Sequence, residues 1–153
     1  MSEATVRAAL KNAIDTVSNV GKTYDYERWA AEWGDFLALF KTTISGTAQI
    51  RGWEVAYRGN DAQRDPQFAR QIIHAHAFQI RGYMRVDDSA ASEKTFAALA
   101  ESVQAAIDAS VTIHSSTYLD ATPATLQAFE PRSFGGVLCH YAQINITVTE
   151  QVT

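Results

Sequence analysis

Two histidines, His74 and His76, are the residues whose type and spacing come nearest to a metal site. They lie two positions apart in a stretch of strand-like composition, so both side chains project from one face of the strand. A third imidazole, from His114 or His140, would complete a zinc-like cluster. Carboxylate or thiolate ligands at a recognisable spacing are absent, and polar strand residues explain the pair equally well. We therefore predict no metal site and no cofactor, and keep a small histidine-based metalloprotein as an alternative.

The one cysteine, Cys139, stands next to His140, a pairing that could supply a thiolate and its base. Successive strand residues point to opposite faces, so these two cannot hydrogen-bond as a catalytic pair. The sequence also lacks a phosphate-binding loop, a dinucleotide-binding glycine pattern and a nucleophile elbow. The glycine-rich run from Ser133 to Gly136 leads into a strand, which predicts a tight turn or a bulge. We predict no catalytic residue and no enzymatic activity.

Arginine and aromatic side chains gather on one face of a predicted strand, at Arg81, Tyr83 and Arg85, to which we add Arg51 and Trp53 of the preceding strand. These residue types are enriched in protein interfaces and in their energetic hot spots. The face is therefore a candidate subunit interface. A solvated strand face, with arginine stems lying along apolar surface, is the alternative.

A second candidate interface is the segment that contains Tyr24, Tyr26, Trp29 and Trp33. So many large aromatic residues in a poorly regular segment suggest a surface shared with a neighbouring subunit. The alternative is a local satellite of the hydrophobic core.

The elements that must position these residues begin with two amphipathic helices. From Glu3 to Ser18, apolar side chains recur at intervals of three and four residues, and Gly21 ends the pattern. A second helix follows N-cap candidates at positions 87–89, and its apolar stripe is Phe96, Leu99, Ala100, Val103 and Ile107. Residues 24–40 are expected to form a loop that leads into a short, imperfect helix.

Strand-like composition marks residues 47–58 and 71–86, which should pair as an antiparallel hairpin across a long mobile loop at 59–70. The second of these strands alternates, with a core face at Phe78, Ile80, Met84 and Val86, whereas the first has no clear inward face. After an irregular stretch at 110–124, a short strand near 126–129 precedes a final strand over 137–149. In the final strand one face is apolar, with Leu138, Ala142, Ile144, Ile146 and Val148 pointing the same way.

This order of elements predicts an α+β fold: a mostly antiparallel sheet of about four strands, with two main helices packed on one face. With 153 residues and 46% hydrophobic content, the chain is expected to form one domain over residues 1–153. A net charge of −4 argues against general attraction to nucleic acid or anionic lipid. The sequence shows neither a targeting signal nor a membrane span, so we expect synthesis in a cytoplasm and no membrane partner.

Three stretches carry a family resemblance: Ile50 to Val55, His76 to Tyr83, and Glu130 to Tyr141. Together they resemble the tail terminator, or tail completion, proteins of long-tailed bacteriophages and their prophage relatives. The resemblance spans nearly the whole chain. Arg132 and Phe134, in the third stretch, complete the set of candidate subunit-interface residues.

The resemblance implies a structural virion protein of the tail or neck. Such a protein forms a ring, expected to be a hexamer, that caps the tail tube, ends elongation and joins the tail to the head connector. Its partners would be further copies of itself, the tail tube protein and the head-closure protein, and DNA would pass through the ring without sequence-specific contact. A head-closure or neck connector subunit of the same particle is the alternative, because it would share size, fold class and ring geometry.

Overall fold

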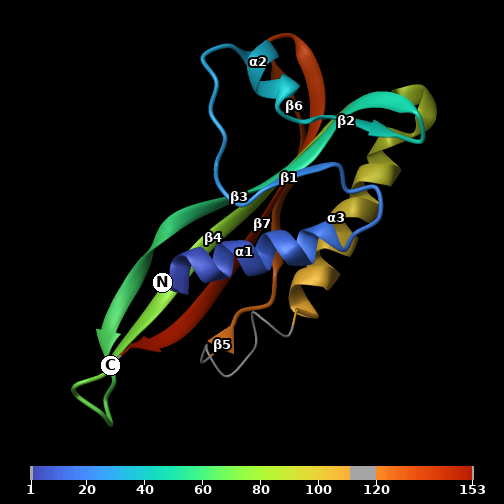
Figure 1. Ribbon diagram of the computed structural model, residues 1–153. Helices are drawn as coiled ribbons and strands as arrows, with labels where there is room; N and C mark the ends of the chain where they lie inside the picture. Colours follow the sequence, from blue (N-terminus) through green and yellow to red (C-terminus); the bar gives the residue numbers. More distant parts are fainter. Residues whose placement is uncertain (1, 111–119, 153) are drawn as a thin grey trace.

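The computed structural model describes residues 2–110 and 120–152, which form an α+β fold around a mixed sheet (Figure 1). Strands lie in the order β1-β3-β4-β7-β5, with β2 also paired to β3 and β6 also paired to β7. In chain order the elements are α1 (Ser2–Asp15), β1 (Lys22–Tyr24), α2 (Trp33–Ala38), β2 (Lys41–Ile44), β3 (Thr47–Arg64), β4 (Ile72–Arg85), the 3₁₀ turn η1 (Asp88–Ala90), α3 (Ser92–Asp108), β5 (Asp120–Ala121), β6 (Thr125–Phe134) and β7 (Val137–Val152).

The predicted α+β class is confirmed, whereas the strand count was too low. The three long strands β3, β4 and β7 pair antiparallel at the centre, as expected. Short strands extend both sides of this centre, and β1 runs parallel to β3. Strands of two to four residues are too short to show a period of two, so the alternation of side chains did not reveal them.

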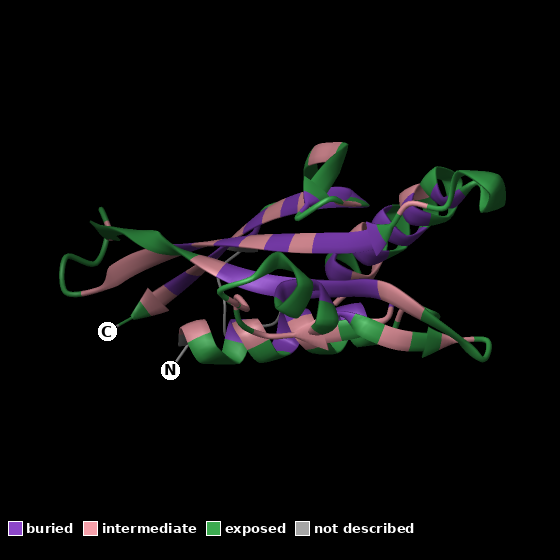
Figure 2. Ribbon diagram, turned by 90° about the horizontal axis from the view of Figure 1, so that it is seen from above, coloured by how far each residue is buried: buried purple, intermediate pink, exposed green. Residues whose placement is uncertain are grey.

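Helices α1 and α3 pack on one face of the sheet and form the main core with it (Figure 1). The predicted stripe of α3 is buried as expected, and α1 buries its stripe although it ends at Asp15, before the predicted end at Ser18. Opposite the helices lie Val55, Phe78, Ile80, Ala142 and Ile144. Figure 2 shows buried positions along the middle of the sheet and exposed positions at the ends of its long strands. Of the apolar residues predicted to share one face of the last strand, Leu138 at its start is exposed.

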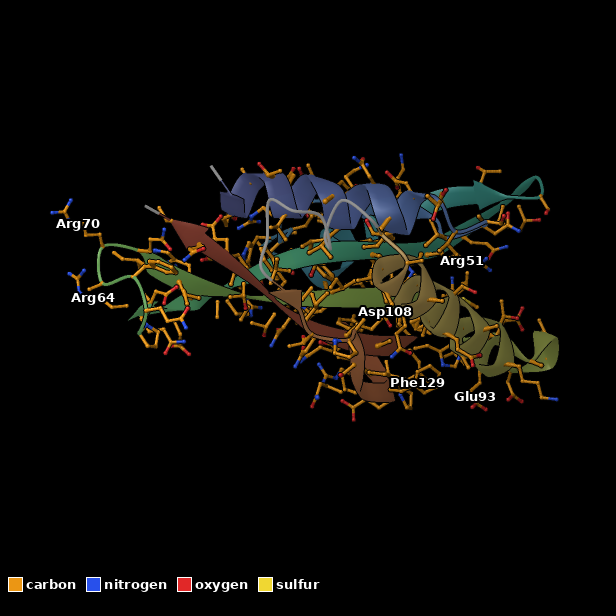
Figure 3. All side chains as sticks on the ribbon, turned by 90° about the horizontal axis from the view of Figure 1, so that it is seen from below. Arg51, Arg64, Arg70, Glu93, Asp108 and Phe129 are labelled. Atoms are coloured by element: carbon orange, nitrogen blue, oxygen red, sulfur yellow. The ribbon has the colours of Figure 1, made fainter. Side chains whose placement is uncertain are left out.

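The β3–β4 hairpin is longer than predicted. Residues 59–64, expected in a mobile loop, continue β3 as far as Arg64, after a bulge between Tyr57 and Asn60. Gly59 within this bulge has a φ of +98°, which glycine adopts without strain. This arm extends beyond the core and exposes its side chains (Figure 3), which explains why its composition is that of a loop.

The start of α3 also differs from the prediction. Asp88 lies in the turn η1 and does not cap α3. The helix begins after Ala91, which has a φ of +52°. The Ser92 hydroxyl accepts a hydrogen bond from the Asp87 backbone N–H at 2.8 Å. The turn is therefore closed by a serine inside the helix rather than by an acidic cap before it.

A second, smaller core covers the other face of the sheet, which was predicted to be open. Helix α2 and the residues around it lie over one end of β4, β6 and β7 (Figure 1). The buried members of this core are Phe36, Leu37, Phe40, Tyr83, Phe134, Cys139 and Tyr141. At this end, therefore, both faces of the sheet are covered by the chain itself.

Within residues 2–110 and 120–152, no helix combines the length and the apolar character needed to cross a membrane.

The contact between Trp53 and Gly82 yields a test of this packing. A β-carbon at Gly82 would lie 2.6 Å from the Trp53 ring, which is fully buried. We expect Gly82→Ala to lower the free energy of unfolding by about 1–3 kcal/mol, because overpacking a buried site forces neighbouring groups to move. Equilibrium urea unfolding measures the change.

Gly34→Ala is the matched control, because a β-carbon at Gly34 meets nothing within 4 Å. It lies in α2, where alanine is favoured over glycine by up to about 1 kcal/mol. Equal stability of the two variants would contradict the close packing of Trp53 on Gly82.

Candidate interaction surface

The segment from residue 24 to residue 35, called the aromatic segment below, exposes large apolar side chains in the folded chain. Trp29 is 80% exposed, Trp33 53% and Tyr26 49%. Tryptophan is usually well buried, and neighbouring exposed aromatic side chains typically mark a contact site for another molecule. This segment, the second interface candidate from the sequence, is therefore the strongest candidate for an interaction surface among the described residues.

Ion pairs hold the aromatic segment against the sheet. The Glu27 carboxylate accepts a hydrogen bond from Arg58 of β3 at 3.0 Å and another from Arg81 of β4. The hydrogen bond from Arg58, together with that from Arg81, holds the pKa of Glu27 below its usual value despite partial burial. The segment is thereby fixed in place before any partner binds.

A buried carboxylate, Glu54 of β3, provides the second anchor. It is 1% exposed and accepts hydrogen bonds at 3.0 Å from the Arg28 backbone N–H and from the Tyr83 hydroxyl. The guanidinium of Arg81 lies 3.6 Å away. Burial raises the pKa of Glu54 in spite of these donors, and burial also raises the pKa of Tyr83. The hydrogen bond from Arg28 ties the aromatic segment to the sheet, whereas Tyr83 and Arg81 join this carboxylate to the neighbouring strand β4.

The far end of the aromatic segment rests on the turn between β6 and β7. The Trp33 ring meets Phe36 and Phe134 edge-on, with ring centroids 5.7 and 5.3 Å apart. The turn is formed by Gly135 and Gly136, whose φ angles of +61° and +87° fit a tight two-residue hairpin, as predicted. A β-carbon at Gly135 would lie 2.7 Å from Trp33, so the close approach requires glycine.

The strand face expected to form an interface is mostly internal. Tyr83 is 4% exposed beneath α2, and Arg81 is paired with Glu27 and Glu54. Arg85 alone of these three predicted residues is exposed. The prediction failed because a segment more than forty residues earlier in the chain covers this face, which the alternation of a single strand does not reveal.

Trp53 and Arg51 point to the opposite face from that group, so their assignment to it was wrong. Trp53 is 1% exposed and packs in the main core. Arg51 is 7% exposed and donates to the Asn19 carbonyl at 3.1 Å and to Gln49 Oε1 at 2.9 Å. Cross-strand pairing with Gly82 and Met84 sets this orientation.

Two of the remaining candidates, Arg132 and Phe134, lie on β6. Arg132 stacks on the Tyr141 ring, 3.8 Å from its centroid, and pairs with Glu130 at the surface. Phe134 is buried in the second core. Tyr24, the first residue of the aromatic segment, is half-buried against the same core. Arg132 thus remains available at the surface, whereas Phe134 does not.

The histidine pair lies on one face of β4, as predicted. The rings stack with centroids 5.8 Å apart, and His76 contacts the Tyr57 hydroxyl at 2.9 Å and Glu150 at 3.3 Å. No group of three potential metal ligands occurs in the described part of the chain. His140 lies on β7, opposite the other end of β4, and contacts Ser92. His114 lies outside the described residues.

Cys139 and His140 point to opposite faces of β7, as predicted. Cys139 is buried under α2, and burial raises the pKa of its thiol to about 11. The ring of His140 packs against Phe96 of α3, on the helix side of the sheet.

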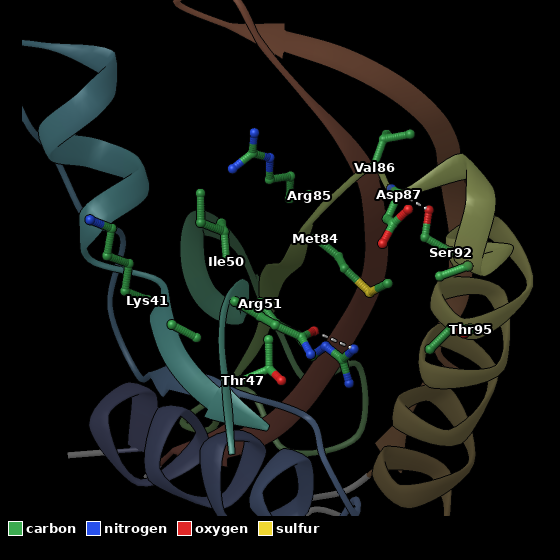
Figure 4. A pocket seen from close by; sticks show the side chains of 13 residues that line it. Lys41, Thr47, Ile50, Arg51, Met84, Arg85, Val86, Asp87, Ser92 and Thr95 are labelled. Carbon is green, nitrogen blue, oxygen red and sulfur yellow. Dashed lines mark hydrogen bonds between the residues drawn. The ribbon is translucent and has the colours of Figure 1, made fainter. Parts of the chain in front are cut away.

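A feature that sequence reasoning missed is a pocket of about 660 Å³ between the β2–β3 hairpin and the start of α3 (Figure 4). Three cations line it: Lys41, Arg51 and Arg85. Asp87 is its one acidic lining residue. None of the three cations forms an ion pair with a described residue. We call this the basic pocket. Its cations come from three strands and follow no spacing that a sequence pattern could reveal.

No protein-family model matches the sequence, and a search of curated proteins finds none that is similar to it.

The Glu27 anchor yields a prediction about acid stability. We expect Glu27→Gln to lower the free energy of unfolding by about 1 kcal/mol at neutral pH, because two charge-assisted hydrogen bonds weaken. Since pairing lowers the folded-state pKa below 4.5, this stabilisation is complete above that pH and is lost as pH falls through the folded-state pKa. Urea unfolding from pH 7 downward should show the two stability curves converging in acid.

Glu130→Gln serves as the control, since it removes the same charge from an exposed pair with Arg132. We expect its effect to stay within about 0.5 kcal/mol. A loss as large as that in Glu27→Gln would show that the anchor has no special role.

Proposed function

We propose that this protein is a structural virion subunit, a tail terminator that forms a ring on the end of a phage tail tube. The observation that carries the proposal is the rigidly held, exposed aromatic segment. An exposed Trp29 on a segment anchored through Glu27 and Arg28 loses little conformational freedom on binding, so its burial contributes to affinity with a small entropic cost. The resemblance to tail terminators supplies the kind of particle.

A ring requires two different, complementary surfaces on each subunit, because its contacts are heterologous and must close by rotation. The aromatic segment provides one such surface. The ring is proposed to be a hexamer that stops tube growth and joins the tail to the head connector, with DNA passing through it. No catalytic step is part of this role.

The proposal is tested by mixing the purified protein with the tail tube protein of the same phage and imaging the product by electron microscopy. Tubes of limited length, each with a thin ring at its end, are the expected result. Uncapped tubes of unchanged length would overturn the terminator role and would favour a head-closure subunit, which should instead bind the portal-side adaptor.

A point variant connects this role to the aromatic segment. We expect Trp29→Ala to abolish capping while changing the free energy of unfolding by no more than about 0.5 kcal/mol, because the side chain is 80% exposed. Tube lengths and urea unfolding measure the two effects.

Phe68→Ala is the matched control. Phe68 is also aromatic and exposed, at 58%, but it lies at the tip of the β3–β4 hairpin. Capping should persist in this variant. Normal capping by Trp29→Ala would show that the aromatic segment does not mediate assembly.

A further inference from the structure

The basic pocket carries positive charge that the chain does not neutralise. Arg51 hydrogen-bonds only to uncharged groups among the contacts described, a carbonyl and an amide oxygen, and Lys41 and Arg85 are exposed cations at the same pocket. With Asp87 as the acid of the lining, the pocket has an excess of positive charge. Ile50 and Val86 add apolar surface to the lining. An occupant that fits must therefore combine negative charge with apolar bulk.

The aromatic segment has this composition. Beside Trp29 and Trp33 it exposes Glu32 and Asp35, and neither acid forms an ion pair with a described residue. The two features thus match in both charge and apolarity. Complementary charge of this kind selects partners and sets their orientation.

The segment cannot occupy the pocket of its own chain. Residues 25–32 rise from β1 on the left of α2 in Figure 1, whereas β2 and the start of α3, which border the pocket, lie on its right. Glu27 and Arg28 hold the segment on its own side of the molecule. Two different surfaces of one chain that match each other form a head-to-tail contact between copies, which generates a ring when the rotation closes.

We infer that the basic pocket of one subunit receives the aromatic segment of the next, with Glu32 and Asp35 facing Lys41 and Arg85 and the indoles against Ile50 and Val86. This inference rests on the proposed ring-forming role and specifies its contact. It replaces the predicted interface at Arg81 and Tyr83, which the chain itself covers.

Charge exchange tests the contact. One variant, Glu32→Lys with Asp35→Lys, makes the segment basic; the other, Lys41→Glu with Arg85→Glu, makes the pocket acidic. All four side chains are exposed, so folding should persist, which thermal unfolding checks. Sedimentation velocity from micromolar to millimolar protein at low salt measures self-association. We expect each variant alone to associate at least about tenfold more weakly than the unmodified chain, because like charges then face each other.

An equimolar mixture of the two variants should assemble again. In the mixture, each basic segment meets an acidic pocket, and each acidic segment meets a basic pocket. The chain carrying all four substitutions should also assemble. The control Arg64→Glu with Arg70→Glu makes the same change of charge at the hairpin tip (Figure 3) and should associate normally.

Several results would overturn the inference: an unmodified chain that stays monomeric throughout, variants that associate normally, or a mixture that does not recover. Loss of tube capping without any change in self-association would assign both surfaces to the tube protein instead. Rings that obey the charge exchange yet fail to cap tubes would uphold this contact while refuting the terminator role. If each variant alone still capped tubes, the terminator role would stand and this contact would be refuted.

Discussion

The register of β3 against β4 is the constraint on which the rest of the structure depends. It places Trp53 opposite Gly82 on the helix side of the sheet and Glu54 opposite Arg81 on the other. The glycine makes room for the indole that fills the main core, and the Glu54–Arg81 pair gives the aromatic segment a charged anchor through Arg28. A shift of one residue would turn Glu54 into the apolar core and expose Trp53, so the two faces fix each other.

How far the sequence predicts this fold depends on how far apart along the chain the interacting residues lie. The apolar stripes of α1 and α3 and the alternation in β4 and β7 each repeat over a few residues and face the main core. These predictions are confirmed. The second core depends on residues 24–40 folding over a distant strand. Arg81 and Tyr83 therefore resembled a solvated face, because their cover and their carboxylate partners come from elsewhere in the chain. For the aromatic segment the sequence left two interpretations open, a shared surface and a satellite of the core. Trp29 and Trp33 are exposed, whereas Tyr24 packs against the second core.

In the proposed ring, stability comes from the sheet and recognition from the aromatic segment. The long antiparallel strands and two helices form a core that does not need the aromatic segment, whereas Glu27, Arg28 and the β6–β7 turn hold that segment in one conformation. Most of the ordering cost of an interface is then met when the subunit folds rather than when subunits meet. In such an arrangement, contacts between subunits can be modest in area and still select one geometry.

Burial of Cys139 under α2 would matter in the proposed ring, where copies of the chain lie close together. The thiol is inaccessible and almost wholly protonated at neutral pH, because burial raises its pKa to about 11. Thiolate is the form that reacts with oxidants and other thiols, so copies held side by side do not become cross-linked through sulfur when a cell opens and its reducing environment is lost. For the same reason the chain offers a silent background for labelling: one cysteine introduced at the surface would be its sole reactive thiol.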